Sequence, residues 1–335
     1  MKTAAVAAAP GLTWEDYLVM LVSEHGSLAA IALKVSLAGG NVADAASVER
    51  ALRRLRKKEH HEGGQYGQRL LRVFGVPREV EQRVKWMGVY HSRFTDLPVS
   101  LCLDQLRVWD RPPVSASRAR AWLELGFATC ALRLEDLSRA EAHLKAARGG
   151  HVSVEARIET LLIQAYVASR RGERALAREG LAEVEPMLEA PEIGTGDRAC
   201  LLARWLDQRA YQLLHPAEGS PPDLEGAMAL YQRIPTRAAP FFAACKRDSG
   251  LAYVHFCLGD APRAVMHAEA ACQSAGDGGF VRLRIACLGL LARVLGDSEA
   301  RAAEIRARAI LAARALEDED LLGRLRRAAP PIAAV

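Results

Sequence analysis

Apolar residues in the amino-terminal part of this chain recur every three or four positions, which is the spacing of an amphipathic helix. The pattern predicts three short helices, at about residues 14–25, 28–38 and from 45 or 48 to 61. Each follows a residue suited to cap a helix, namely Thr13, Ser27 and either Asp44 or Ser47. Glycines after each stripe are expected to end the helix.

The segment that follows has a different pattern. Leu71 and Val73 alternate with polar residues, and Gly67 lies where a turn would fall, so residues 65–74 predict a short hairpin. Residues 78–108 return to helical spacing, with an interruption at Pro98. The stretch 110–117, DRPPVSAS, predicts a domain boundary because prolines and small polar residues interrupt helices.

The chain as a whole predicts an all-α protein with at most a small hairpin. Half of its residues are hydrophobic, with alanine and leucine dominant, and aromatic residues make up only 6%. The predicted segments are a disordered tail over 1–11, an amino-terminal module over 12–77, a helical connector over 78–115, a repeat array over 116–327 and a tail over 328–335.

A recurring spacing of small residues supports the repeat array. The same offsets of 0, 14, 18 and 21 separate Gly126, Ala140, Leu144 and Ala147, and again Gly250, Ala264, Ala268 and Ala271. A weaker copy consists of Leu161, Ala175, Glu179 and Ala182, and a partial one of Ala227, Tyr231 and Ile234. The turn sequence Leu-Gly-Asp at 258–260 recurs at 295–297. Small residues at fixed helical intervals indicate repeated close helix pairs.

With Trp122 and Leu125 ahead of Gly126, this pattern resembles the tetratricopeptide repeat over roughly residues 116–315. The resemblance implies stacked helical hairpins whose first helices line a groove for a protein or peptide. The candidate groove residues are Arg157, Gln164, Arg204, Gln208 and Lys246. The alternative is an irregular helical bundle with ordinary solvated polar residues.

Charge is concentrated near the amino terminus. The net charge is +5, and residues 1–85 hold 13 Lys and Arg against 9 Asp and Glu, which is +4. The predicted third helix carries a core stripe of Val48, Leu52 and Leu55. Its other side carries the candidate nucleic-acid-binding residues Arg50, Arg53, Arg54, Lys57 and Lys58.

Three short helices followed by a hairpin resemble a winged helix-turn-helix module. In that arrangement the third helix would enter the major groove of duplex DNA, and Arg69 and Arg72 would lie on the wing. Two other interpretations of the basic helix remain open: a surface that docks an acidic protein, and a solvated face without a ligand. Cations at the carboxyl end of a helix also favour its dipole.

Together the two halves resemble, in architecture only, bacterial regulators of the SARP class, which join a winged helix-turn-helix to tetratricopeptide-like repeats. The resemblance implies a DNA-binding, transcription-regulating protein whose array binds a protein or peptide, with homodimerisation plausible. The alternative is a protein-interaction adaptor or scaffold without DNA binding.

The composition argues against other classes of protein. Seven cysteines occur without a CxxC pair, which favours a reducing interior, and no run of 18 apolar residues predicts a membrane span. The first 11 residues are too weakly apolar for a convincing signal peptide, so a cytoplasmic protein is expected.

Candidate chemistry is sparse. His60 and His61 are adjacent on a helix, about 100° apart, and are not placed to hold one metal ion together. His91 and Asp96 have no evident nucleophile nearby and are expected to cap helices or lie at the surface. The acidic run at 317–320 predicts a solvated face, or pairing with arginines. We therefore expect no enzyme activity, no metal and no cofactor.

Overall fold

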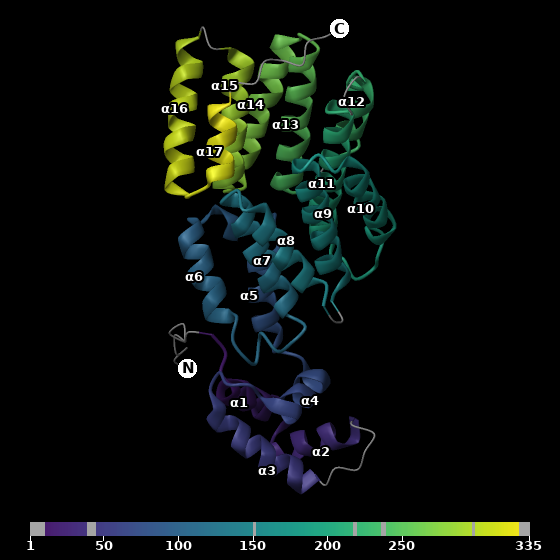
Figure 1. Ribbon diagram of the computed structural model, residues 1–335, viewed down its shortest axis with the longest axis vertical. Coiled ribbons are helices and arrows are strands. Elements are labelled where there is room, and N and C mark those ends of the chain that lie inside the picture. The colour runs from purple at the N-terminus through teal and green to yellow at the C-terminus, as the bar shows by residue number, and fades with distance from the viewer. Residues whose placement is uncertain are drawn as a thin grey trace. The chain divides into compact units, whose positions relative to one another are not determined.

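A computed structural model describes residues 11–38, 45–149, 152–216, 220–235, 239–296 and 299–327. These residues form helices, turns and loops without a strand, and helix accounts for 77% of the structure (Figure 1). The all-α prediction is confirmed. The predicted tails at 1–10 and 328–335, the break at 39–41 and the cap at Asp44 lie outside the described residues.

The chain forms two compact units, and each is described by itself. Unit 1 contains residues 1–89, 103–127 and 146–152, and unit 2 contains residues 90–102, 128–145 and 153–335. The units are therefore interleaved along the sequence, whereas the segments predicted above follow one another in order.

The amino-terminal part of unit 1 is built from short helices. They are α1 (Trp14–His25), α2 (Leu28–Ala38), α3 (Ala45–Leu55), the 3-10 turn η1 (Arg56–Lys58) and α4 (Gly64–Phe74). Helix α1 begins in a capping box, where Thr13 and Asp16 each bond the other's backbone amide. The three predicted amphipathic helices are confirmed, although α3 ends at Leu55 and continues only as η1.

The predicted hairpin at 65–74 is wrong, since this segment forms helix α4. The sequence predicts a turn at Gly67, but this residue lies inside the helix and against the ring of Trp14. A Cβ atom at Gly67 would lie 2.9 Å from Trp14 Cη2, and one at Gly63 would lie 2.4 Å from Trp14 Cζ2. Both glycines therefore allow the α4 region to pass closely over an indole that is fully buried.

The rest of unit 1 comes from α5 (Arg78–Gly88) and from parts of α6 (Val99–Trp109) and α7 (Arg120–Arg133). A Cβ atom at Gly88 would lie 2.3 Å from the carbonyl oxygen of Trp122, so the two backbones are in direct contact. Gly126 likewise faces the carbonyl oxygen of Met87, at 2.9 Å from a Cβ position. The small residue that opened the sequence repeat is thus required by a close helix approach.

Unit 2 is built from successive helical pairs, with each helix packed on the next. The pairs are α9 (Val154–Arg170) with α10 (Arg174–Met187), α11 (Thr195–Leu214) with α12 (Leu224–Gln232), α13 (Phe241–Cys257) with α14 (Ala261–Asp277), and α15 (Val281–Leu295) with α16 (Ala300–Ala315). The chain adds α8 (Leu137–Ala147) before them and α17 (Glu319–Arg326) after them. The first helices α9, α11, α13 and α15 also contact one another in that order.

One turn geometry recurs in this unit. A residue with positive φ stands at 135, 172, 259 and 317, and the following residues are Asp136, Glu173, Asp260 and Asp318. In each case the amide of that second residue donates to the carbonyl five positions earlier, as in Asp260 to His255 at 2.9 Å. Asp136, Asp260 and Asp318 also accept a bond from the amide three positions later, which caps the next helix.

The predicted spacing of small residues matches buried positions in the α13–α14 pair, but not in every predicted copy. In the α13–α14 pair, Ala264, Ala268 and Ala271 are fully buried, and a Cβ atom at Gly250 would lie 2.1 Å from the Tyr231 ring of α12. The copy placed at Leu161 is wrong by two positions, because Ala175, Glu179 and Ala182 are exposed. The same offsets starting from Ile163 reach Ala177, Leu181 and Val184, which are all buried.

Gly250→Ala is expected to destabilise the protein, because the new methyl group overlaps the buried Tyr231 ring. The expected loss is about 1–3 kcal/mol, the usual cost of overpacking a helix interface. Gly180→Ala is the matched control within α10, where the nearest atom to the added Cβ lies 3.9 Å away. Chemical denaturation of both variants checks this, and equal stability of the two would contradict the close approach of α12 and α13.

Candidate functional site

Helix α3 and the 3-10 turn η1 carry a cluster of exposed cations. The buried side of α3 consists of Val48, Ala51, Leu52 and Leu55. Six cations lie on the exposed side of α3 and in η1, namely Arg50, Arg53, Arg54, Arg56, Lys57 and Lys58. We call these six residues the basic face. The exposure of all six agrees with the sequence prediction that this helix divides into a core stripe and a charged stripe.

Some of these cations have partners within the unit. Arg53 pairs with Glu49 on the same helix at 2.7 Å, and Arg56 pairs with Glu15 of α1 at 3.0 Å. Arg50 donates to the hydroxyl of Ser47 at 3.0 Å. Exposed pairs of this kind contribute little and are easily exchanged for another anion. Within the described residues Arg54 and Lys57 make no ion pair, so their charge is available to a ligand.

The residues predicted to lie on a wing belong to a helix instead. Arg69 and Arg72 belong to α4, where Arg72 is exposed and Arg69 is partly buried. Helix α2 packs on α3, and α4 contacts both helices. Short packed helices are therefore present here, but the described residues contain no strand, so the predicted winged helix-turn-helix is not shown.

In unit 2, residues 90–97 lie across the first helices of the pairs, and we call this segment the strap. It includes the 3-10 turn η2 (Arg93–Asp96). Side chains of the strap contact residues of α9, α11, α13 and α15, as described below. The face predicted to bind a partner thus carries a segment of the same chain.

Tyr90 opens the strap between two arginines. The guanidinium carbon of Arg204 lies 4.4 Å from the centre of its ring, and Arg282 donates from Nη1 to its hydroxyl at 3.0 Å. Burial acts to raise the pKa of Tyr90, but Arg282, Lys246 and two further arginines outweigh it and leave the pKa below the usual 10.0. The environment of this oxygen therefore favours negative charge.

His91 anchors the strap on α9 and α11. Its Nδ1 lies 3.5 Å from Glu159 and its Nε2 lies 3.4 Å from Asp197, and its ring stands 5.6 Å from that of Phe242. Burial and Arg204 act to lower the pKa of His91, but the two carboxylates more than compensate and raise it above 6.5. His91 is thus largely buried, contrary to the surface position expected from the sequence.

Asp96 caps helix α15 from outside that helix. Its Oδ1 accepts the backbone amide of Arg282 at 2.7 Å, and no side chain of the neighbouring N-cap residue, Phe280, provides such a bond. Burial raises the pKa of Asp96, although the amides of Arg282 and Val281 act in the opposite direction. The capping role expected for Asp96 is therefore confirmed.

The acidic run at 317–320 is divided: Glu317 and Glu319 are exposed, whereas Asp318 and Asp320 are buried. Asp318 is fully buried and pairs with Arg133 at 3.0 Å and Arg282 at 2.6 Å. Asp320 is 2% exposed and pairs with Arg170 and Arg324. Burial acts to raise the pKa of Asp318, but Arg282 and Arg133 hold it below 3.8. For Asp318 and Asp320, the alternative prediction of pairing with arginines is therefore correct.

Arg133 is the centre of this arrangement. Only 1% of it is exposed, and besides Asp318 it donates to the carbonyl oxygens of Leu97 at 2.9 Å and Leu316 at 2.8 Å. One guanidinium therefore joins α7, the end of the strap and the turn before α17. No signal in the sequence singled this arginine out among 38.

The five predicted groove residues have different surroundings. Arg204 is buried against Glu159, Gln208 donates to the carbonyl of Leu162 at 2.9 Å, and Lys246 pairs with Asp207 at 2.7 Å. Arg157 is exposed and lies 3.8 Å from Glu183, and Gln164 is partly buried. Arg204 and Lys246 thus meet the strap or its surroundings, while Arg157 faces solvent.

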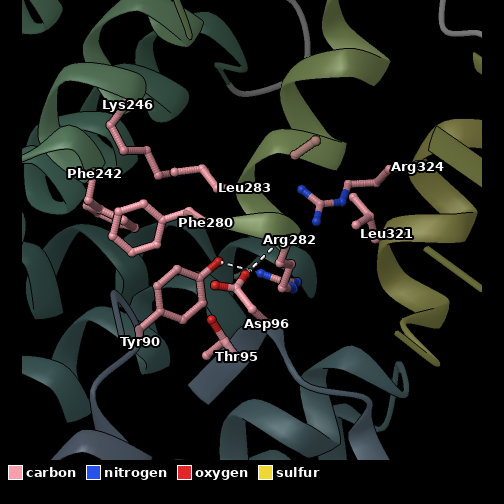
Figure 2. A pocket seen from close by; sticks show the side chains of 11 residues that line it. Tyr90, Thr95, Asp96, Phe242, Lys246, Phe280, Arg282, Leu283, Leu321 and Arg324 are labelled. Carbon is pink, nitrogen blue, oxygen red and sulfur yellow. Dashed lines mark hydrogen bonds between the residues drawn. The ribbon is translucent and has the colours of Figure 1, made fainter. Parts of the chain in front are cut away.

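A small pocket of about 60 Å³ lies beside the strap (Figure 2). Its polar lining comes from Tyr90, Thr95, Asp96, Lys246, Arg282 and Arg324, and its apolar lining comes from Phe242, Phe280, Leu283, Ala286 and Leu321. The strap, α13, α15 and α17 all contribute. Of these lining residues, the sequence pattern indicated only Lys246 and Asp96 as candidates for a role.

The described residues show neither a cluster of metal ligands nor a disulfide. No three of their His, Cys, Asp or Glu side chains are grouped to hold a metal ion, and none of the seven cysteines forms a disulfide. Within the same ranges no single helix has the length and apolarity to span a membrane. Only α1 and α2 taken together, with a bend of 91° between them, have that length and apolarity. Comparisons with family models, curated proteins and solved structures find no match to this chain.

Asp318→Asn is expected to destabilise unit 2 strongly, because it leaves Arg133 buried without a carboxylate while keeping a residue that can cap α17. Loss of one partner from a buried ion pair costs about 3–5 kcal/mol. The exposed neighbour Glu319→Gln makes the same change in charge and should alter stability by no more than about 0.5 kcal/mol. Similar unfolding midpoints for the two variants would rule out a structural role for the pair.

His91 should make stability depend on pH. Its pKa is raised on folding, so its stabilising contribution is complete below the unfolded value of 6.5 and is lost as pH rises through the folded pKa. His91→Gln should therefore cost more stability at pH 6 than at pH 8, as measured by denaturant unfolding at each pH. A cost that is the same at both values would show that folding does not raise the pKa of His91.

Proposed function

We propose that this protein is a DNA-binding regulator that contacts duplex DNA through the basic face. The observation that carries the proposal is the exposure of six cations within residues 50–58, three on the exposed side of α3 and three in η1. A helix of this form fits the major groove, where arginine and lysine can contact phosphates or guanine edges. The packing of α2 on α3 is consistent with a helix-turn-helix arrangement without a wing.

We propose further that unit 2 is a tetratricopeptide-like array that binds a protein or peptide. Its recurring turns and buried small residues support the likeness to that repeat. The strap on its first helices, which includes the 3-10 turn η2, supports the idea that this face accepts a polypeptide segment. A regulator would combine such an array with a DNA-binding module, as the architecture suggested by the sequence does.

A salt titration on duplex DNA tests the first proposal. Phosphate contacts make the logarithm of the binding constant fall linearly with the logarithm of the salt concentration, by about 0.9 per contact. Arg54→Ala/Lys57→Ala removes the two basic-face residues whose side chains make neither an ion pair nor a hydrogen bond within the described residues. Fluorescence anisotropy with a labelled duplex should show weaker binding and a slope smaller in magnitude by about 2.

Arg308→Ala/Arg314→Ala on α16 is the matched control, since it removes the same charge from exposed positions in unit 2. This control should bind DNA like the parent protein. Binding that is equal in the parent and in Arg54→Ala/Lys57→Ala would exclude the basic face as the contact. Failure of the parent to bind any duplex would favour the adaptor function, in which the same face docks an acidic protein.

A further inference from the structure

We propose that the pocket beside the strap binds a short-chain carboxylic acid, with its carboxylate held by Lys246, Arg282 and Arg324. This inference concerns unit 2 alone and does not depend on DNA binding. The three cations come from three different helices, α13, α15 and α17, and line one small cavity (Figure 2). Each cation also pairs with a carboxylate outside the lining, Lys246 with Asp207, Arg282 with Asp318 and Arg324 with Asp320.

These cations retain donors for a ligand. The ammonium group of Lys246 has three N–H groups and uses one on Asp207. Arg324 pairs through Nη2 with Asp320, and 45% of its side chain is exposed. Arg282 is more fully engaged, with Asp318 at Nε and Tyr90 at Nη1. Lys246 and Arg324 therefore supply the direct contacts, and Arg282 contributes mainly through its charge.

The residues that line the pocket include three cations and one carboxylate, so their formal charges favour an anion. The lowered pKa of Tyr90, another lining residue, agrees with this balance. Asp96 is the one carboxylate of the lining. Its Oδ1 accepts the backbone amide of Arg282 at the amino end of α15, where the helix dipole offsets part of the negative charge.

Size and shape select the kind of acid. A water molecule needs about 10–15 Å³ of such space, so a pocket of 60 Å³ admits on the order of four to six heavy atoms. One wall is apolar, with Phe242 and Phe280 in an edge-to-face pair at 5.8 Å and with Leu283 and Leu321 beside them. An acid of two to four carbons fits this combination, whereas a phosphate would leave the apolar wall without a contact.

Calorimetric titration of the full chain with propionate tests the proposal, with acetate, butyrate, phosphate and chloride as comparison probes. Propionate should bind saturably and more tightly than phosphate or chloride. Arg324→Met should weaken it by about tenfold or more, since a charge-assisted hydrogen bond is lost. Asp320 keeps Arg170 as a partner in that variant. Arg308→Met on α16 removes the same charge from another exposed position and should bind like the parent.

A second variant separates charge from volume. Ala286→Leu fills part of the pocket without altering any charge, so it should also weaken propionate while circular dichroism shows the helices intact. The proposal is overturned if propionate does not bind the parent, if Arg324→Met binds as well as Arg308→Met, or if phosphate binds more tightly than propionate. The last outcome would point to a general anion site instead.

Discussion

The buried pairing of Arg133 with Asp318 is the interaction on which the organisation of unit 2 depends. Both side chains are essentially inaccessible, so each charge requires the other. The same guanidinium holds the carbonyl oxygens of Leu97 and Leu316, and the same carboxylate holds Arg282. One ion pair therefore fixes the strap, the turn before α17 and the start of α15, which are far apart in the sequence.

That constraint explains why the first helices of the pairs are rich in polar residues on one side. Glu159, Arg204, Lys246 and Arg282 contact the strap or the charged groups around it, so they are not free groove residues. A small cationic pocket remains beside the strap because the rings of Phe242 and Phe280 and the side chains of α17 do not fill it. Charge and packing thus produce a site that the amphipathic pattern does not indicate.

The sequence predicted the helical class, α1 to α3 and the small-residue spacing, because these depend on local periodicity. It failed at residues 65–74, where Gly67 suggested a turn although the glycine is required by the nearby Trp14 ring. It also placed one repeat copy at Leu161 instead of Ile163, because alanines occur on both sides of α10. The pairing of residues 318 and 320 with arginines up to 185 positions away has no local signal.

The functional account rests on the claim that the basic face contacts DNA, and amide hydrogen exchange with and without duplex tests it most directly. The account predicts that slowed exchange on DNA addition is concentrated in peptides covering residues 45–58, with the helices of unit 2 little changed. Unchanged exchange across those residues at saturating duplex, or protection confined to unit 2, would contradict it.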